Sequence, residues 1–174
     1  MIRKIAALAL LLVALTLPSS GQEALSGLKE LAVRLVRELD IAIQHAVLGR
    51  LAADLQDLKI QAHQVLNVLV GRGGPGYDPQ FGDPGDGVGL VVYARRLARE
   101  VEVLDQRYQM IADNIRFFVD SAVGHVQRSL RTGKAGEARA GLHHALAYLL
   151  AARGAPQDLP SEGGARTLQR LLGG

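Results

Sequence analysis

The histidines are the residues with most scope for chemistry in this 174-residue chain. All of them fall on or near segments with helical periodicity, so a helical protein could gather some around a metal ion or a haem. They are His45, His63, His125, His143 and His144. Their spacing argues against such a site, because the sequence holds no His-x-x-x-His and no Glu-x-x-His pair. The latter motif supplies ligands in ferritin-like carboxylate bundles.

His125 falls where a buried residue is expected, three positions after Ala122 on an apolar stripe. We interpret it as a histidine that is hydrogen-bonded at a partly solvated end of a helical bundle. The alternative is an axial haem ligand, with Met110 or another histidine as its partner. Met110 is about 22 Å away along a straight helix, so these two side chains could share one metal only if the helix breaks.

A second candidate site is the stretch GRGGPGYDPQFGDPGDGVG, residues 71–89, which holds eight glycines, three prolines and three aspartates. Loops of this length in compact domains are usually functional or disordered. Phosphate binding is disfavoured, because no strand precedes the glycines and no Lys-Ser or Lys-Thr pair follows them. Calcium could bind Asp78, Asp83 and Asp86 together with backbone carbonyls. However, the spacing is not Asp-x-Asp-x-Asp-Gly, and no glutamate closes the loop.

We favour a structural role for this loop. Asp83 and Pro84 have the pattern of a helix N-cap followed by the first helical residue, and Asp86 would complement the helix dipole in the first turn. Tyr77 and Phe81 would anchor the loop on the helices.

The helix before the loop indicates where the loop lies. Beside its main apolar stripe it carries Ile60, His63, Asn67 and Val70, on a face that a simple helical hairpin would leave exposed. Buried backbone groups need hydrogen-bond partners, so we expect the loop to fold over this face, with His63 and Asn67 bonding its backbone. The candidates for clasping the loop or binding a ligand are His63, Asn67, Tyr77, Asp78, Phe81, Asp83 and Asp86. The weaker metal candidates are His63, His125, Asp78, Asp83 and Asp86.

Four segments with apolar residues spaced three and four apart must position these side chains. The first covers residues 25–46 and is expected to stop at Gly49, and the second covers 51–69 and is expected to stop at Gly71. The short gap between them predicts an antiparallel hairpin.

The third segment predicts one long helix from about 88 to 131, with 120–124 as the place where it could kink. The fourth covers 135–152 and ends at Gly154, and residues 165–172 could form a short terminal helix. No stretch alternates with period two. The expected fold is therefore all-α, an antiparallel up-down four-helix bundle with one long ordered loop between its second and third helices.

The N-terminus MIRKIAALALLLVALTLPSSGQ has two basic residues followed by a thirteen-residue run that is apolar except for Thr16, and then proline and small residues. This is the pattern of a secretory signal peptide, and the apolar run is shorter than the ~20 residues that span a bilayer. No cysteine follows, which excludes a lipid-modified N-terminus. We expect residues 1–21 to be removed, and 22–174 to form one secreted or periplasmic domain with no stable membrane insertion.

The overall charge excludes a nucleic-acid partner. The sequence pI of about 9.5 is dominated by the signal segment, without which eighteen basic residues face seventeen acidic ones, a net charge of +1. Phosphate-backbone binding needs clustered cations, whereas here basic and acidic residues are interleaved. The absence of cysteine excludes c-type haem, an iron–sulfur cluster and a thiolate zinc site.

Catalysis has little support in the sequence. Ser121 and His125 are four positions apart and could touch, but no acid is placed to orient the histidine. No nucleophile-elbow motif occurs, and most helical carboxylates fall off the apolar stripes. We therefore expect that the protein is not an enzyme.

The stretch QAHQVLNVLVGRGGPGYDPQFGDPGDGVGLVVYA, followed later by ADNIRFFVDSA, resembles a group of secreted bacterial proteins for which no activity is known. In that group a His-x-x-x-Asn helix precedes a glycine- and aspartate-rich loop that ends near Pro-Gly-Asp-Gly-x-Gly. Some of those loops carry extra acidic positions that this chain lacks. The resemblance implies that the loop is a built feature of the fold, and it implies no activity.

These observations favour a secreted or periplasmic, non-enzymatic binding or interaction module with an envelope or extracellular partner and no cofactor. The alternative is a metal- or haem-binding bundle that uses its histidines, or that binds calcium in the 78–86 region.

Overall fold

The computed structural model describes residues 19–173, and helices are the only regular secondary structure in this part of the chain, which has no strand. This confirms the all-α prediction. Residues 1–18, which contain most of the expected signal peptide, lie outside the described residues. The elements are α2 (Ser19–Leu51), α3 (Leu55–Val70), the 3₁₀ turn η1 (Pro79–Phe81), α4 (Leu90–Glu100), α5 (Gln106–Arg131), α6 (Ala135–Arg153) and α7 (Ala165–Leu171).

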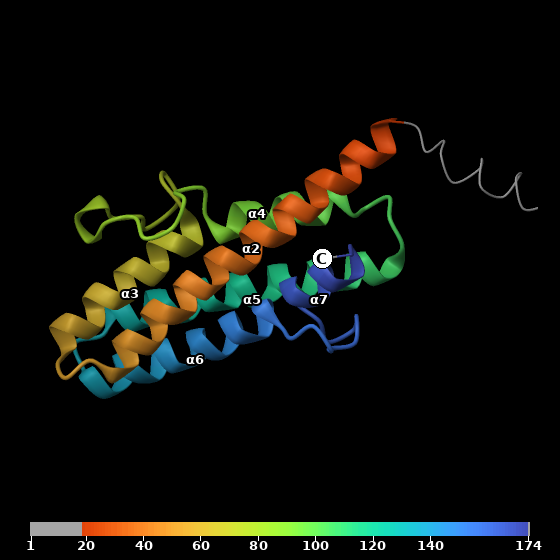
Figure 1. Ribbon diagram of the computed structural model, residues 1–174. Coiled ribbons are helices and arrows are strands. Elements are labelled where there is room, and N and C mark those ends of the chain that lie inside the picture. The colour runs from red at the N-terminus through yellow and green to blue at the C-terminus, as the bar shows by residue number, and fades with distance from the viewer. Residues whose placement is uncertain (1–18, 174) are drawn as a thin grey trace, which may run out of the picture.

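The helices lie against one another as Figure 1 shows, and their buried side chains form one apolar core. The most extensive contact is between α5 and α6, and α2 packs against both α3 and α6. The shorter α4 lies against α2 and α5, and α7 closes the core against α2. The residues of the expected apolar stripes supply the largest buried side chains, among them Leu35, Leu39, Leu58, Leu69, Leu97, Ile111, Ile115, Leu142 and Leu149.

The first helix does not end at Gly49 as expected. α2 continues through Gly49 to Leu51, because Gly49 allows neighbouring helices to approach closely and does not terminate the helix. A Cβ on Gly49 would lie 2.4 Å from Leu142 Cδ2 on α6 and 3.0 Å from Gln61 Cβ on α3. Leu51, expected on the second stripe, is exposed, and α3 begins only after Asp54, whose carboxylate accepts a hydrogen bond from the Asp57 amide.

The single long helix expected over 88–131 is wrong. The chain turns between Glu100 and Gln106, giving α4 and α5, while α5 runs unbroken through the region 120–124. Asp105 caps α5 by accepting from the Arg107 amide. The apolar spacing continues through the turn, where Val101 is still buried, so periodicity alone could not reveal the break.

The C-terminal part follows the sequence expectation. α6 ends at Gly154, which has a positive φ of 63°, and the terminal helix predicted over 165–172 is α7. Thr167 in α7 is fully buried, and its hydroxyl donates to the Ala155 carbonyl at 2.9 Å. None of the helices in residues 19–173 is long and apolar enough to cross a membrane.

The contact between α5 and α6 predicts opposite effects for two glycine substitutions. A Cβ on Gly141 would lie 3.1 Å from the His125 carbonyl oxygen and 3.2 Å from Ser129 Cα, both backbone atoms of α5. Gly141→Ala should therefore lower Tm despite its better helix propensity, since overpacking costs about 1–3 kcal/mol. Gly124→Ala, in open space within α5, should raise stability by about 1 kcal/mol. Thermal unfolding measures both, and an equal effect of the two would contradict the close approach.

Candidate functional site

Residues 71–89 form a closed loop whose two ends touch. The Arg72 amide donates to the Gly87 carbonyl at 2.8 Å. Gly71 and Gly89 have positive φ values of 70° and 95°, and a Cβ on Gly71 would lie 2.2 Å from the Val88 carbonyl oxygen. We call the place where Gly71 and Gly89 meet the neck of the loop. Only glycine adopts this backbone there without strain, which explains part of the high glycine content of the loop.

Asn67 of α3 holds the middle of the loop. Its side chain is fully buried and makes three hydrogen bonds to loop backbone. The amide nitrogen donates to the carbonyls of Asp78 at 2.7 Å and Gly82 at 2.6 Å, and its oxygen accepts from the Asp78 amide at 2.9 Å. The expected contact between Asn67 and the loop backbone is confirmed.

His63 contacts the loop differently from the expectation, which had it bonding backbone groups. Its ring stacks on Phe81, with centroids 3.9 Å apart and planes 2° from parallel. His63 Nδ1 is buried and has no hydrogen-bond partner among the described residues. Burial lowers the pKa of this imidazole, and the Asp78 carboxylate opposes that effect. His63 therefore anchors the loop through contact between two ring faces.

Asp83 does not cap a helix as expected, because α4 begins seven residues later, at Leu90. Its carboxylate instead accepts from Arg72 Nε at 2.7 Å, and the Tyr77 hydroxyl lies 3.5 Å from the same oxygen. Tyr77 is partly buried against the core, so it anchors the loop as expected.

Asp86 also precedes α4 and is not in its first turn. Its carboxylate accepts from the Val88 amide at 2.9 Å and from the Tyr93 hydroxyl. Its own backbone amide donates to Glu38 Oε2 of α2 at 3.2 Å. The last part of the loop is thereby tied to both α2 and α4.

Glu38 is a participant that the sequence analysis missed. It is only 2% exposed, and burial raises the pKa of its carboxyl, with the Asp86 carboxylate raising it further. The sequence does indicate that Glu38 is buried, since it stands three residues after Leu35 and four before Ala42, at the spacing of the apolar stripe. A carboxylate at such a position requires a polar partner, which here is the loop.

The three loop aspartates do not converge. Asp78 caps η1 by accepting from the Gln80 amide at 3.0 Å, whereas Asp83 faces Arg72 and Asp86 faces Tyr93. Within residues 19–173, no group of three or more histidine or acidic side chains is placed to hold a metal ion.

His125 is half-buried on α5 and is not a core residue, because the following Val126 takes the buried position. Its ring lies beside those of His144 and Tyr148, with centroids 5.0 and 5.3 Å away. Arg128 Nη2 lies 3.1 Å from His125 Nδ1, so a guanidinium occupies the ring edge. Burial and this cation lower the pKa of His125.

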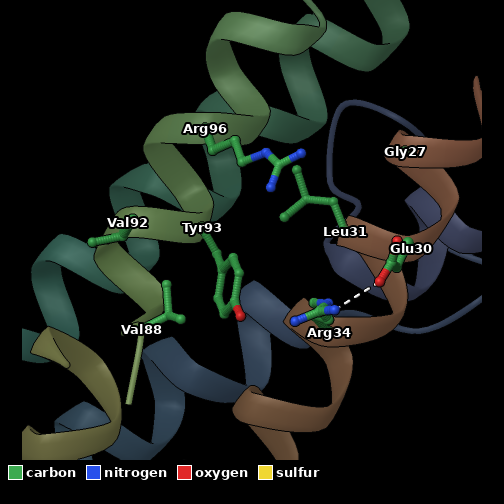
Figure 2. Close-up of a pocket in the computed structure, with 8 residues that line it drawn as sticks. All are labelled: Gly27, Glu30, Leu31, Arg34, Val88, Val92, Tyr93 and Arg96. Atoms are coloured by element: carbon green, nitrogen blue, oxygen red, sulfur yellow. Dashed lines mark hydrogen bonds and ion pairs between the residues drawn. The ribbon is translucent and has the colours of Figure 1, made fainter. Parts of the chain in front are cut away.

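A pocket of about 300 Å³ lies between α2 and α4, beside the end of the loop (Figure 2). Its apolar surface comes from Leu31, Val88, Val92 and the Tyr93 ring, and its polar groups are Glu30, Arg34 and Arg96. In Figure 2 the Arg96 guanidinium reaches from α4 over the pocket toward α2, which carries Arg34. Two arginines from different helices thus border one apolar hollow.

Each of these arginines already has one acidic partner on its own helix. Arg34 Nη2 lies 2.7 Å from Glu30 Oε1, and Arg96 Nε lies 2.5 Å from Glu100 Oε1. The hydrogen bond from Arg34 lowers the pKa of Glu30, and Glu30 in turn raises the pKa of Arg34. Each guanidinium has five N–H donors, so both retain donors for a further anion.

The Asn67 contacts predict that Asn67→Ala will loosen the loop. The substitution leaves two covered backbone carbonyls without a donor, which should cost roughly 2 kcal/mol or more and lower Tm by several degrees. In this variant, cleavage by a non-specific protease within residues 75–85 should be faster than in the native protein. Gln80→Ala, an exposed loop residue, is the matched control. Unchanged stability and cleavage in the Asn67 variant would contradict the assigned role.

Burial of Glu38 predicts a pH-dependent effect of Glu38→Gln. A carboxyl whose pKa is raised by folding stabilises the fold below its unfolded pKa, and this contribution is lost as pH rises through the folded pKa. The introduced glutamine keeps an acceptor for the Asp86 amide without a charge. The variant should therefore gain Tm relative to the native protein at pH 7, and this gain should shrink toward pH 4. A difference in Tm between the variant and the native protein that stays constant with pH would contradict this effect, in which burial disfavours the charged form of Glu38 in the folded state.

Comparisons with known proteins give this chain no family. No protein-family model, no curated protein and no solved structure matches it. The candidate site is therefore defined by its geometry, and the resemblance of the loop region to secreted bacterial proteins stays a prediction.

Proposed function

We propose that this protein is a secreted or periplasmic binding module without catalytic activity, and that the pocket between α2 and α4 is its ligand site. The ligand class that fits is an anionic group attached to an apolar body. The observation that carries this proposal is the pair Arg34 and Arg96, which approach one apolar hollow from two helices.

The charge and exposure of the two arginines support an anionic ligand. Their side chains are 52% and 54% exposed, so they are accessible without a conformational change. A planar guanidinium pairs with carboxylate, sulfonate or phosphate oxygens through two parallel N–H donors. Glu30 offsets part of the positive charge, which favours a ligand with a single negative charge over a polyanion such as nucleic acid.

The apolar wall supports a ligand with an apolar body. Val88 and Val92 are 42% and 46% exposed, and covering them would remove apolar surface from water. Val88 belongs to the loop, and the neighbouring Asp86 is bonded to both Glu38 and Tyr93. The loop therefore fixes one side of the pocket, which gives the glycine-rich segment a part in binding.

Two further parts of the proposal rest on the sequence. The signal-like N-terminus supports export, with an envelope or extracellular molecule as the ligand or partner. The spacing of the apolar stripes supports an antiparallel up-down four-helix bundle made of α2, α3, α5 and α6, to which α4 and α7 are added.

The proposal predicts binding of the fluorescent probe anilinonaphthalene sulfonate, which joins a sulfonate to an apolar ring system. Fluorescence titration should show saturable binding that weakens with added salt, because the contact involves accessible charges. Arg34→Gln and Arg96→Gln should each weaken binding roughly tenfold, since a hydrogen bond to a charged group contributes about 1.5–3 kcal/mol.

Arg99→Gln provides the matched control, because Arg99 is exposed on the same helix as Arg96 but does not line the pocket. Equal Tm values for the three variants and the native protein would show that the fold is intact. Equal probe affinity in the Arg34/Arg96 double variant and the native protein would overturn the proposed site, as would the absence of saturable binding.

A further inference from the structure

A second hollow, of about 320 Å³, lies on the other side of α4 at the neck of the loop. It is bordered by Val70 at the end of α3, Pro75 of the loop, Val91 of α4 and Val123 of α5. We call it the valine cleft. Val92 borders both the valine cleft and the α2–α4 pocket, so this side chain separates the two.

The loop side of the valine cleft is a fixed wall. Gly74 lies directly on the last turn of α3, where a Cβ would come within 2.3 Å of the Val70 carbonyl oxygen. The Gly74 amide donates to the Gly71 carbonyl at 3.0 Å. Val70 is only 8% exposed. This wall of the cleft is therefore formed by the packed end of α3 and by hydrogen-bonded loop backbone.

Two opposite charges stand at the rim of the valine cleft. Arg95 is one turn beyond Val91 on α4, and Asp120 is one turn before Val123 on α5. Both side chains are exposed, and the same two residues also border the open surface beyond the rim.

Neither rim charge has a partner of opposite charge within residues 19–173. Within the described part of the chain, Arg95 and Asp120 make no side-chain hydrogen bond and no ion pair within 4.0 Å, with each other or with any other residue. By contrast, Arg34, Arg72 and Arg96 each have a carboxylate partner. An unpaired cation and an unpaired anion therefore share the mouth of one apolar cleft.

We propose that the valine cleft binds a small zwitterion, an α-amino acid with a branched apolar side chain. The carboxylate pairs with Arg95, the ammonium group pairs with Asp120, and the side chain enters the space between the valines. This site is separate from the α2–α4 pocket and does not depend on the function proposed for that pocket.

Two arguments from charge favour a zwitterion, and the size of the cleft favours a single amino acid. A monoanion would satisfy Arg95 but would meet the like charge of Asp120, and a monocation would have the reverse conflict. A purely apolar ligand would cover both charges without pairing them, which is unfavourable. The cleft is also at the small end of the size range of ligand sites, which suits a single amino acid.

The test is isothermal titration calorimetry of the whole chain with three matched compounds. L-leucine carries both charges, isocaproate has the same carbon skeleton without the amine, and isoamylamine has it without the carboxylate. Leucine should bind with a one-to-one stoichiometry, and each analogue should bind at least tenfold more weakly. Equal binding of either analogue would overturn the zwitterion assignment, and no heat of binding with leucine would overturn the site.

Four single variants locate the binding. Arg95→Gln and Asp120→Asn should each weaken leucine binding at least tenfold. Arg99→Gln and Asp113→Asn lie on the same two helices outside the cleft and should leave it unchanged. Because all four residues are exposed, Tm should change little. Full leucine affinity in the Arg95 or Asp120 variant would overturn the proposal.

A charge exchange adds a gain-of-binding test. Arg95→Asp combined with Asp120→Arg places the same two charges at the rim in reversed order, so it should recover at least part of the leucine affinity that either substitution alone removes. No recovery beyond the single variants would contradict pairing with both charges. Titration of the Arg34/Arg96 double variant distinguishes the two sites, because it should bind leucine normally even where the sulfonate probe is lost.

Discussion

The hydrogen bonds of Asn67 are the interaction on which the candidate sites depend. A loop of nineteen residues has no regular structure of its own beyond one short turn, so its backbone groups need partners from elsewhere. Asn67 supplies three of them from a fully buried position on α3. An asparagine side chain can both donate and accept, which allows one residue to hold the loop at Asp78 and Gly82 together.

The ordered loop in turn shapes both hollows beside α4. Its last residues are tied to α2 through Glu38 and to α4 through Tyr93, and Val88 faces the α2–α4 pocket. Its first residues lie on the end of α3 and wall the valine cleft. Because the chain turns between α4 and α5, α4 is a separate short helix that packs against both α2 and α5. It places Val92 between the two hollows, with Arg96 beside the α2–α4 pocket and Arg95 beside the valine cleft.

The helical class and most helix positions follow from the sequence, because apolar spacing reports which face is buried. The same signal failed at Val101, where the buried pattern continues through a turn between two helices. It failed again at Gly49, since a glycine that permits helix contact has the same local pattern as a stop. The Asn67 clasp was predictable from a polar residue on a second stripe. The Asp83 ion pair and the Asp86 contact with Tyr93 depend on the path of the loop, which no local pattern encodes.

Asn67 holds the loop as part of the folded domain. Amide hydrogen exchange of the native protein, followed residue by residue by NMR, measures whether it does so. The Asp78 amide, which donates to the Asn67 oxygen, should exchange orders of magnitude more slowly than that of Gly73, an exposed loop residue, and close to the rate of the α3 amides. Exchange of the Asp78 amide as fast as that of Gly73 would show that the hydrogen bond to Asn67 does not form and that the loop is not held on the folded domain.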